Sequence, residues 1–227
     1  MTIMSYVVID RRKLLNVQEE YIVYTQSFAY AKVALQLYIE ETDIKNKPLD
    51  SKLYSFSDEH GVYEVYVEPE DGKLSLNLTD RKTLENLFKL LAIKNADIKA
   101  REIVNTRDLE NIEFRSLTQL LDFLSYEDFL KVKNHVTINF MPVNPNYADI
   151  IVLKSLGIAT SEAQYIINLR KTQKIHEKDI LLNEDILKKM IFNPRSYLFR
   201  LKVVNRKNHS EFNFILDRGG NVVDIYE

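Results

Sequence analysis

Residues 11–42 read RRKLLNVQEEYIVYTQSFAYAKVALQLYIEET and contain neither proline nor glycine. Apolar side chains recur there every three or four residues, which is the spacing of one face of an α-helix. They are Val17, Tyr21, Tyr24, Phe28, Ala31, Leu35 and Tyr38. The pattern predicts one helix of about 30 residues, well above the usual mean of about 11 to 12. We therefore expect part of the helix to extend past the domain that its apolar face covers, and Pro48 marks the loop after it.

Alternating strand patterns follow the helix. Gly61–Glu68 alternates valine with tyrosine or glutamate, and Lys73–Leu78 alternates apolar and polar residues again. The four residues between them, Pro69-Glu70-Asp71-Gly72, form a turn sequence. We therefore predict a hairpin with an Asp-Gly turn.

Three further strands are predicted at the C-terminus. They cover Tyr197–Val204, Glu211–Asp217 and Asn221–Tyr226. The last two are joined through a turn that contains Gly219 and Gly220. The chain is thus expected to end in a sheet.

The region between the two sets of strands has helical periodicity. Thr79 is a suitable N-cap for a first helix, and Ser116 and Ser125 can cap two further short helices. A strand-like run covers His135–Phe140. The remaining helices are predicted over Tyr147–Leu156, Ser161–Lys171 and Glu184–Ile191.

The order of elements is therefore a long helix, a hairpin, a helical block and three strands. Helices and strands that are segregated in this way indicate an α+β fold. We expect residues 1–76 and 195–227 to form a body in which the long helix packs on an antiparallel sheet. Residues 77–194 are expected to form an all-helical domain inserted between its strands.

The composition describes a globular chain of 227 residues, of which 45% are hydrophobic and 28% charged. Basic and acidic residues nearly balance, with a net charge of −2. Long-range electrostatics therefore favour neither nucleic acid nor an anionic membrane as a partner. No stretch approaches the roughly 18 to 20 consecutive apolar residues that a membrane-spanning helix needs.

Glycine, cysteine and histidine usage argues against several classes of site. The five glycines form no dinucleotide-binding, P-loop or nucleophile-elbow motif. The absence of cysteine excludes disulfides, thiolate nucleophiles and thiolate metal sites. The four histidines, His60, His135, His176 and His209, lie too far apart for a zinc-binding helix motif. We assign no catalytic, cofactor-binding or metal-binding residue, and predict that the protein is not an enzyme.

The N-terminal third of the long helix, Asp10–Glu20, is where the helix is expected to overhang its own domain. Leu14, Leu15 and Val17 supply apolar contacts there among basic side chains, and Tyr21 continues the apolar stripe. We interpret Leu14, Leu15, Val17 and Tyr21 as partner-binding residues. The alternative, that the whole stripe is buried on the sheet of its own domain, remains open.

Several segments of the chain occur in an order that carries a resemblance. They are YTQSFAYA (24–31), DGKLSLN (71–77), EFRSLTQLL (113–121), HVT (135–137), VNPNYA (143–148), LGI (156–158), AQYIINLR (163–170) and SYLFRLKV (196–203). Together they resemble the general secretion pathway protein K family, the minor pseudopilins at the tip of the type II secretion pseudopilus.

The resemblance implies a pilin-like fold, with a large insert that contains elements similar to helix-hairpin-helix and SAM domains. It implies a non-enzymatic subunit that assembles with other minor pseudopilins through its N-terminal helix and supports secretion, with secreted proteins as further partners. The expected location is the bacterial inner membrane, with this domain in the periplasm. Family members begin with a basic leader and an apolar membrane helix, which we expect this chain to lack. Calcium is a family ligand, although the sequence has no acidic cluster with calcium-loop spacing.

Two other functions remain as alternatives. A DNA-uptake or competence pseudopilus subunit of the same fold would contact DNA weakly near Gly157, through a helix-hairpin-helix-like segment with Lys154 and Arg170 as the nearby cations. A small hydrolase would gather a histidine and a carboxylate from distant parts of the sequence into one pocket.

Overall fold

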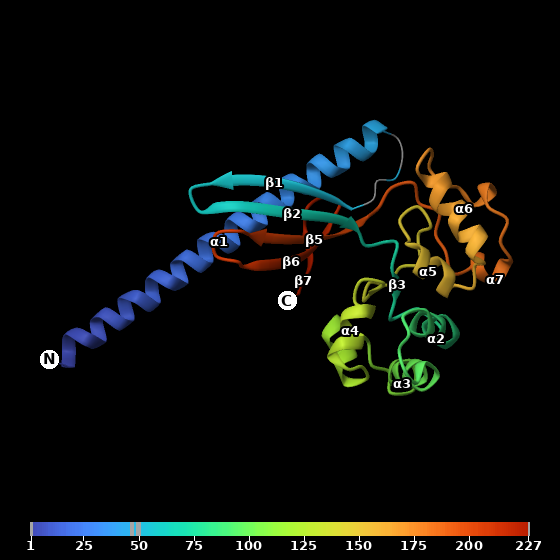
Figure 1. Cartoon of the computed structure of the whole chain (residues 1–227), viewed down its shortest axis with the longest axis horizontal. Helices are drawn as coiled ribbons and strands as arrows, with labels where there is room; N and C mark the ends of the chain where they lie inside the picture. Colours follow the sequence, from blue (N-terminus) through green and yellow to red (C-terminus); the bar gives the residue numbers. More distant parts are fainter. Residues whose placement is uncertain (1, 46–47, 49–50, 227) are drawn as a thin grey trace. The chain divides into compact units, whose positions relative to one another are not determined.

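Helix α1 spans Thr2–Lys45 in the structure, a computed structural model that describes residues 2–45, 48 and 51–226 (Figure 1). Side chains are described within these ranges from residue 17 onward, except those of residues 224 and 226. The long helix predicted from its apolar period is confirmed, with ends beyond residues 11 and 42. Lys45 lies in its last turn, where a positive charge interacts favourably with the helix dipole.

A five-stranded sheet accompanies α1. Its strands are β1 (Lys52–Asp58), β2 (Gly61–Pro69), β5 (Leu198–Asn205), β6 (Glu211–Asp217) and β7 (Val222–Tyr226), in the spatial order β1-β2-β5-β6-β7. The three C-terminal strands predicted from the sequence are therefore confirmed, and they share one sheet with the N-terminal strands.

Strands β2 and β5 are antiparallel neighbours although about 130 residues separate them in sequence. At one end Arg206 N donates to Val62 O at 2.8 Å, and at the other Glu70 N donates to Leu198 O at 2.8 Å. The chain thus leaves the sheet after β2 and returns next to its point of departure.

Helix α1 lies along one face of the sheet (Figure 1), and aromatic side chains of the two are in contact. The contacting pairs, with their ring-centroid distances, are Tyr24–Phe212 (5.5 Å), Phe28–Phe214 (5.5 Å), Tyr30–Phe56 (4.9 Å) and Tyr38–Phe199 (5.8 Å). Such pairs contribute about 0.5 to 1.5 kcal/mol each beyond the burial of their area. The α+β fold class, with a long helix on an antiparallel sheet, is confirmed.

The hairpin predicted between Gly61–Glu68 and Lys73–Leu78 is wrong. Strand β2 pairs instead with β1, so that Asp58 lies opposite Gly61 across a two-residue turn. The Asp58 Oδ1 atom accepts hydrogen bonds from His60 N (2.8 Å) and Gly61 N (3.2 Å), which fixes this turn. Of the predicted second strand, only Leu74–Ser75 is a strand.

Asp71 explains why the Asp-Gly sequence does not close a hairpin. Its carboxylate is buried and accepts hydrogen bonds from Tyr197 N at 2.9 Å and Leu198 N at 3.1 Å. Burial raises the pKa of the Asp71 carboxyl, and the two amide hydrogen bonds oppose this effect. The side chain therefore joins the outgoing chain to the returning one instead of supporting a turn.

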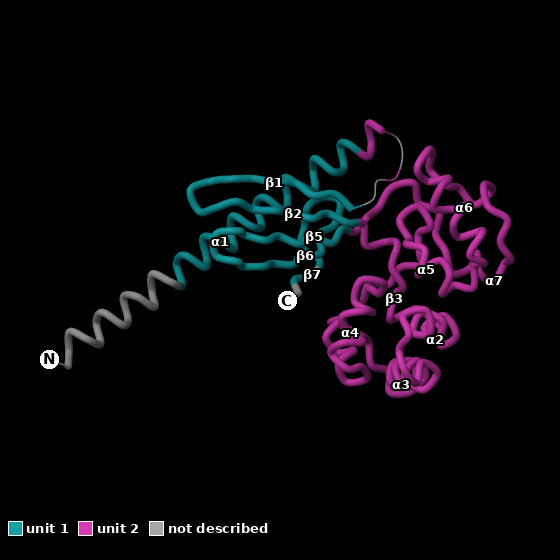
Figure 2. Tube along the Cα trace, viewed as in Figure 1, with its two compact units in different colours: residues 1–41, 51–68, 199–227 teal, residues 42–50, 69–198 magenta. Residues whose placement is uncertain are grey.

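The chain divides into two compact units, coloured in Figure 2. Unit 1 comprises residues 1–41, 51–68 and 199–227, and unit 2 comprises residues 42–50 and 69–198. The domain boundaries expected from the sequence, between residues 76 and 77 and between residues 194 and 195, stay a prediction.

Unit 2 is mainly helical. Its helices are α2 (Arg81–Leu90), α3 (Ala96–Leu109), α4 (Tyr126–Val132), α5 (Ile150–Ser155), α6 (Thr160–Arg170) and α7 (Glu184–Leu187), with 3-10 turns η1 (Leu117–Asp122) and η2 (Glu177–Asp179). The short strands β3 (Leu74–Ser75) and β4 (Val136–Thr137) form a parallel pair within it.

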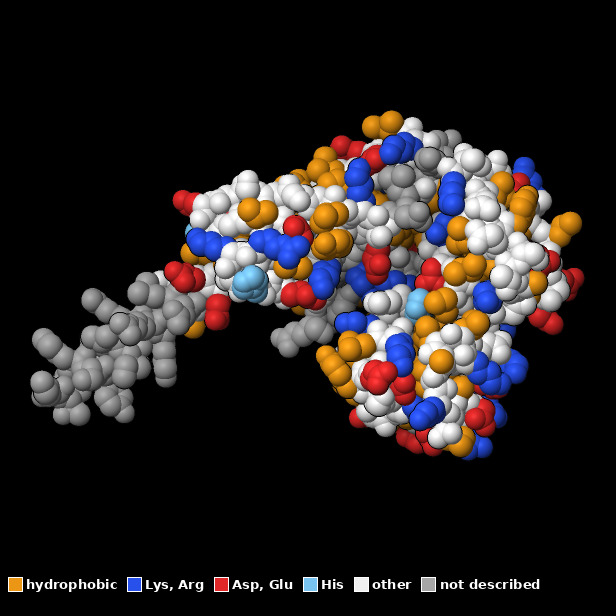
Figure 3. All heavy atoms as spheres, viewed as in Figure 1, with side chains coloured by type: hydrophobic (Ala, Val, Ile, Leu, Met, Phe, Trp, Pro, Cys, Tyr) orange, Lys and Arg blue, Asp and Glu red, His pale blue; other side chains and the backbone are white. Residues whose placement is uncertain are grey.

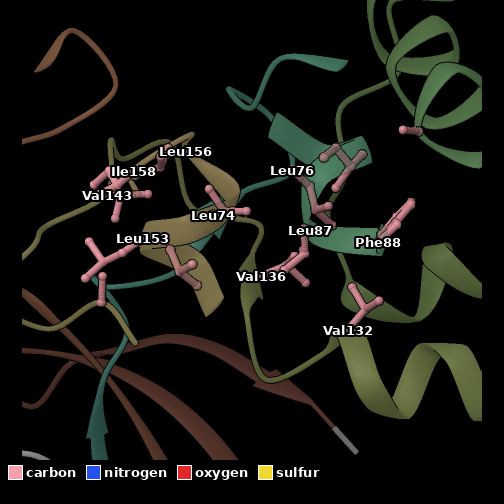
Figure 4. Close-up of a cluster of buried hydrophobic side chains, with 14 of the residues drawn as sticks. Leu74, Leu76, Leu87, Phe88, Val132, Val136, Val143, Leu153, Leu156 and Ile158 are labelled. Atoms are coloured by element: carbon pink, nitrogen blue, oxygen red, sulfur yellow. The ribbon is translucent and has the colours of Figure 1, made fainter. Parts of the chain in front are cut away.

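The core of unit 2 surrounds this pair. Figure 4 shows Leu87 and Phe88 of α2 beside Val136 of β4, with Val132 at the end of α4. All four side chains are fully buried. The apolar period of the helical block is therefore explained by one shared core.

Three predicted helix caps have different outcomes. Ser116 caps η1 with a reciprocal capping box and Ser125 caps α4, as predicted. Thr79 does not cap α2, because the cap is Asp80, whose carboxylate accepts from Thr83 N at 2.9 Å. A carboxylate accepts this hydrogen bond more strongly than a hydroxyl and also complements the helix dipole.

Candidate functional site

The apolar stripe of α1 is buried along the sheet and becomes exposed at its N-terminal end. Tyr24 reaches the Phe212 ring at 5.5 Å, whereas Tyr21 is 70% exposed and Val17 is 62% exposed. The side chains of Leu14 and Leu15 lie outside the described residues. Of the four predicted partner-binding residues, the structure therefore places two on the surface.

The spacing of this stripe shows why Val17 and Tyr21 are candidates for assembly. Val17, Tyr21, Tyr24 and Phe28 follow one another at intervals of four, three and four residues, so all four lie on one helix face. The sheet covers the last two and leaves the first two in solvent. Complete burial of such a side chain against a partner would contribute about 1.5 to 3 kcal/mol.

A second exposed apolar stripe on α1 was missed by the sequence analysis. It consists of Ile22, Ala29, Val33 and Leu37, spaced by seven, four and four residues. Ile22 is 38% exposed, Val33 47% and Leu37 42%. The signal was present in the sequence, but the first stripe alone explained why the helix packs on the sheet. Helix α1 thus offers partners two apolar strips.

Charges on the molecular surface are mixed. On the face that Figure 3 shows, lysine and arginine side chains lie among aspartate and glutamate side chains, in keeping with the net charge of −2. This distribution favours local contacts over long-range electrostatic steering.

His135 and Asp149 form the histidine-carboxylate pair that a hydrolase would need, with 2.6 Å between Nδ1 and Oδ2. Burial by itself would raise the pKa of Asp149, but the hydrogen bonds from His135 and from Val152 N outweigh it and lower the pKa. Asp149 is also the N-cap of α5. Neither residue lines any of the three cavities described for this structure. The pair therefore connects the start of β4 to a helix end.

The segment around Gly157 joins α5 to α6, and Gly157 has a φ of 96° in the left-handed region. Arg170 Nη1 donates to Ala148 O at 2.5 Å, and Lys89, which lines the cavity of about 410 Å³ beside Gly157, pairs with Glu85. Of the cations Arg170, Lys89 and Lys154 near Gly157, the first two are therefore already engaged, which weakens the DNA-contact alternative.

Helix α6 begins at Thr160, one residue before the start predicted from the sequence. The N-cap residue is Ala159, whose side chain makes no capping hydrogen bond. Thr160 and Ser161 therefore lie in the first turn of the helix. The residue before the N-cap, Ile158, is buried in the core.

The described part of the chain contains neither a metal-binding cluster nor a membrane-spanning helix. Within it, no three or more histidine, cysteine, aspartate or glutamate residues form a group able to hold a metal ion. None of its helices combines the length and apolar character that crossing a bilayer requires.

Known proteins resemble this chain in structure rather than in sequence. No family model matches the sequence, and no curated protein matches it. A chain in the crystal structure of the GspK-GspI-GspJ complex from the enterotoxigenic Escherichia coli type 2 secretion system is similar in structure, with a TM-score of 0.65 and 15% sequence identity. The match covers 96% of this chain and 99% of that chain. The protein therefore has a GspK-like fold, in which a long N-terminal helix lies on an antiparallel sheet that carries a helical insert.

Proposed function

We propose that the protein is a non-enzymatic minor pseudopilin, which assembles with other minor pseudopilins at the tip of a type II secretion pseudopilus and supports protein secretion. The observation that carries the proposal is the GspK-like fold, matched over 96% of this chain and 99% of the neighbour. The neighbour was crystallised in a complex with GspI and GspJ. The proposed partners are the corresponding subunits of this protein's own secretion system, with secreted proteins as further partners.

Helix α1 is the proposed assembly element. Val17 and Tyr21 are exposed on the face that is buried elsewhere along the same helix, and Leu14 and Leu15 extend this face toward the N-terminus in the sequence. A partner helix with its own apolar stripe would bury Val17 and Tyr21 together with that stripe, at the typical interaxial distance of about 8 to 10 Å. Such an interface supports assembly without any catalytic group.

The proposed location follows from the same likeness. A type II secretion pseudopilin has its globular part in the periplasm and is anchored in the inner membrane, so we place this domain in the periplasm. The membrane contact would be made by an anchor segment, and the two units would remain in the aqueous compartment.

Val17→Glu tests the assembly surface. Because a charge would have to be desolvated in an apolar helix interface, we expect the variant to bind the I-type and J-type minor pseudopilins of the same system at least tenfold more weakly. Isothermal titration calorimetry of the purified domains measures this affinity. The free energy of unfolding should change by no more than about 0.5 kcal/mol, because Val17 is 62% exposed.

Val62→Glu is the matched control, since Val62 is 45% exposed on β2 rather than on α1. It should leave the affinity within about twofold of the wild-type value. Equal weakening by both variants would show a nonspecific effect of the added charge. Undiminished binding by Val17→Glu would remove this face of α1 from the assembly surface.

A further inference from the structure

A groove on unit 2 lies between helix α6 and the segment 179–182 that follows η2. Its cavity has a volume of about 360 Å³. This volume falls in the range of roughly 300 to 1,000 Å³ that is usual for binding pockets. We call it the α6 groove.

The α6 groove has an apolar interior and unusually exposed apolar walls. Ile166 and Ile180 are buried at 1% and 6% exposure, whereas Tyr165 is 54% exposed and Leu181 is 96% exposed. Because the Leu181 side chain stays almost fully exposed, its burial contributes almost nothing to the stability of the folded chain, and that of Tyr165 contributes only in part. Both side chains can instead serve as anchors for a partner, a role for which tyrosine is especially suited.

The charged groups that line the α6 groove are both acidic. They are Glu162 and Asp179, and no lysine or arginine is among the described lining residues. Asp179 is fixed because its Oδ2 accepts from His176 N at 2.8 Å, and Glu162 lies in the first turn of α6, where the helix dipole favours a carboxylate. The groove is therefore complementary to a cation next to an apolar group.

The backbone along one wall is extended and available for pairing. Ile180 has φ −133° and ψ 139°, which are strand values. Among the backbone hydrogen bonds of the described residues, none involves the N–H group of Leu181 or of Leu182. An extended wall with free N–H groups suits a partner segment that adds alongside it as a strand.

We propose that the α6 groove binds an extended segment of a partner protein, in which lysine or arginine lies two residues before and two residues after an apolar residue, so that all three side chains share one face of the strand. The apolar side chain enters the cavity between Tyr165 and Leu181, and the flanking cations meet Glu162 and Asp179. This interaction uses unit 2 alone. It neither requires nor excludes assembly through α1, so the two proposals fail independently.

Peptide titration of the full chain followed by amide NMR tests the proposal. The probe is the blocked pentapeptide Lys-Ser-Leu-Ser-Lys, compared with Glu-Ser-Leu-Ser-Glu and Lys-Ser-Ser-Ser-Lys. We expect the first peptide to shift amide signals of residues 161–166 and 179–182, with an affinity that falls as salt is added. The other two should bind at least about fivefold more weakly, because each lacks one of the two features.

Two substitutions then separate the apolar and ionic contributions. Leu181→Ser should weaken binding of the first peptide roughly tenfold, as expected for loss of an anchor. Glu162→Gln should weaken its binding about twofold to fivefold, as expected for an exposed ion pair. The matched controls are Leu109→Ser, at a leucine 79% exposed at the end of α3, and Glu177→Gln, at a glutamate outside the lining. Both controls should retain wild-type affinity.

Several results would overturn the proposal. They are equal binding of the acidic peptide, shifts that map away from the α6 groove, and affinities unchanged by Leu181→Ser. Binding of the first peptide as a helix, visible in its own carbon chemical shifts, would also contradict the extended mode.

Discussion

Gly72 has no room for a side chain. A Cβ atom at this position would lie 2.4 Å from the carbonyl carbon and oxygen of Tyr147 and 2.6 Å from Ala148 N, and backbone atoms cannot move aside as a flexible side chain can. Gly72→Ala should therefore lower the free energy of unfolding of unit 2 by about 1 to 3 kcal/mol or more, measured by urea denaturation. Gly219→Ala is the control, because its Cβ would meet only the side chains of Asp217 and Asn221 at 3.2 Å. An unchanged free energy of unfolding in Gly72→Ala would contradict the close approach of Gly72 to the backbone of Tyr147 and Ala148.

The lowered pKa of the Asp80 carboxyl should make the free energy of unfolding depend on pH in the acid range. Burial by itself would raise the pKa of its carboxyl, but the hydrogen bonds from Lys189 and Thr83 outweigh burial and lower the pKa from 3.8 to about 2. Because the pKa is lower in the folded state, the stabilisation is complete above about pH 4 and is lost as the pH falls toward 2.

Asp80→Asn tests this prediction because it keeps the capping acceptor and removes the charge. The difference in unfolding free energy between wild type and variant, from denaturation at several pH values, should be largest above pH 4 and shrink as the pH falls toward 2. Lys189→Met should reduce the same pH dependence, since Lys189 Nζ lies 2.7 Å from Asp80 Oδ2. A difference that grows on acidification would have the wrong sign for a lowered pKa.

At the scale of the element, α1 combines a structural role and a proposed assembly role along one face. Tyr38 and Tyr21 both belong to its first apolar stripe, but Tyr38 is 1% exposed and Tyr21 is 70% exposed. Tyr38→Ala should therefore cost unit 1 about 3 to 5 kcal/mol, and Tyr21→Ala no more than about 0.5 kcal/mol. Thermal unfolding of the two variants measures the contrast. Equal destabilisation would place Tyr21 in the core of the domain and end its candidacy for assembly.

At the scale of the whole molecule, most of unit 2 is inserted in the sequence between β2 and β5, which are neighbours in the sheet. The bonds Arg206 N–Val62 O and Glu70 N–Leu198 O, extended along the strands, place Pro69 opposite Phe199. Replacing residues 70–198 by Asn-Gly should therefore close β2 and β5 into a two-residue hairpin and leave a folded helix-plus-sheet body. A cooperative melt and dispersed amide NMR signals are the expected result. A non-cooperative product would show that unit 1 depends on the insert.

The sequence was sufficient for features that rest on local patterns. The long helix, the three C-terminal strands and the caps at Ser116 and Ser125 follow from apolar period and side-chain chemistry over a few residues, and the structure contains all of them. The exposure of Val17 and Tyr21 was also expected, because a helix longer than its sheet leaves part of its apolar face uncovered.

Pairing partners were decided only by the tertiary structure. The Asp-Gly sequence led to the prediction that strand β2 pairs with residues 73–78 after it, whereas in the structure it pairs with residues 52–58 before it. The buried Asp71 carboxylate binds amides more than 120 residues away, an interaction that no local pattern contains. The α6 groove and the His135–Asp149 pair could not be predicted for the same reason, because each combines residues that are distant in the sequence. A helix or turn is selected by neighbours in sequence, whereas strand pairing, grooves and buried charges depend on which distant groups the fold brings within hydrogen-bonding distance.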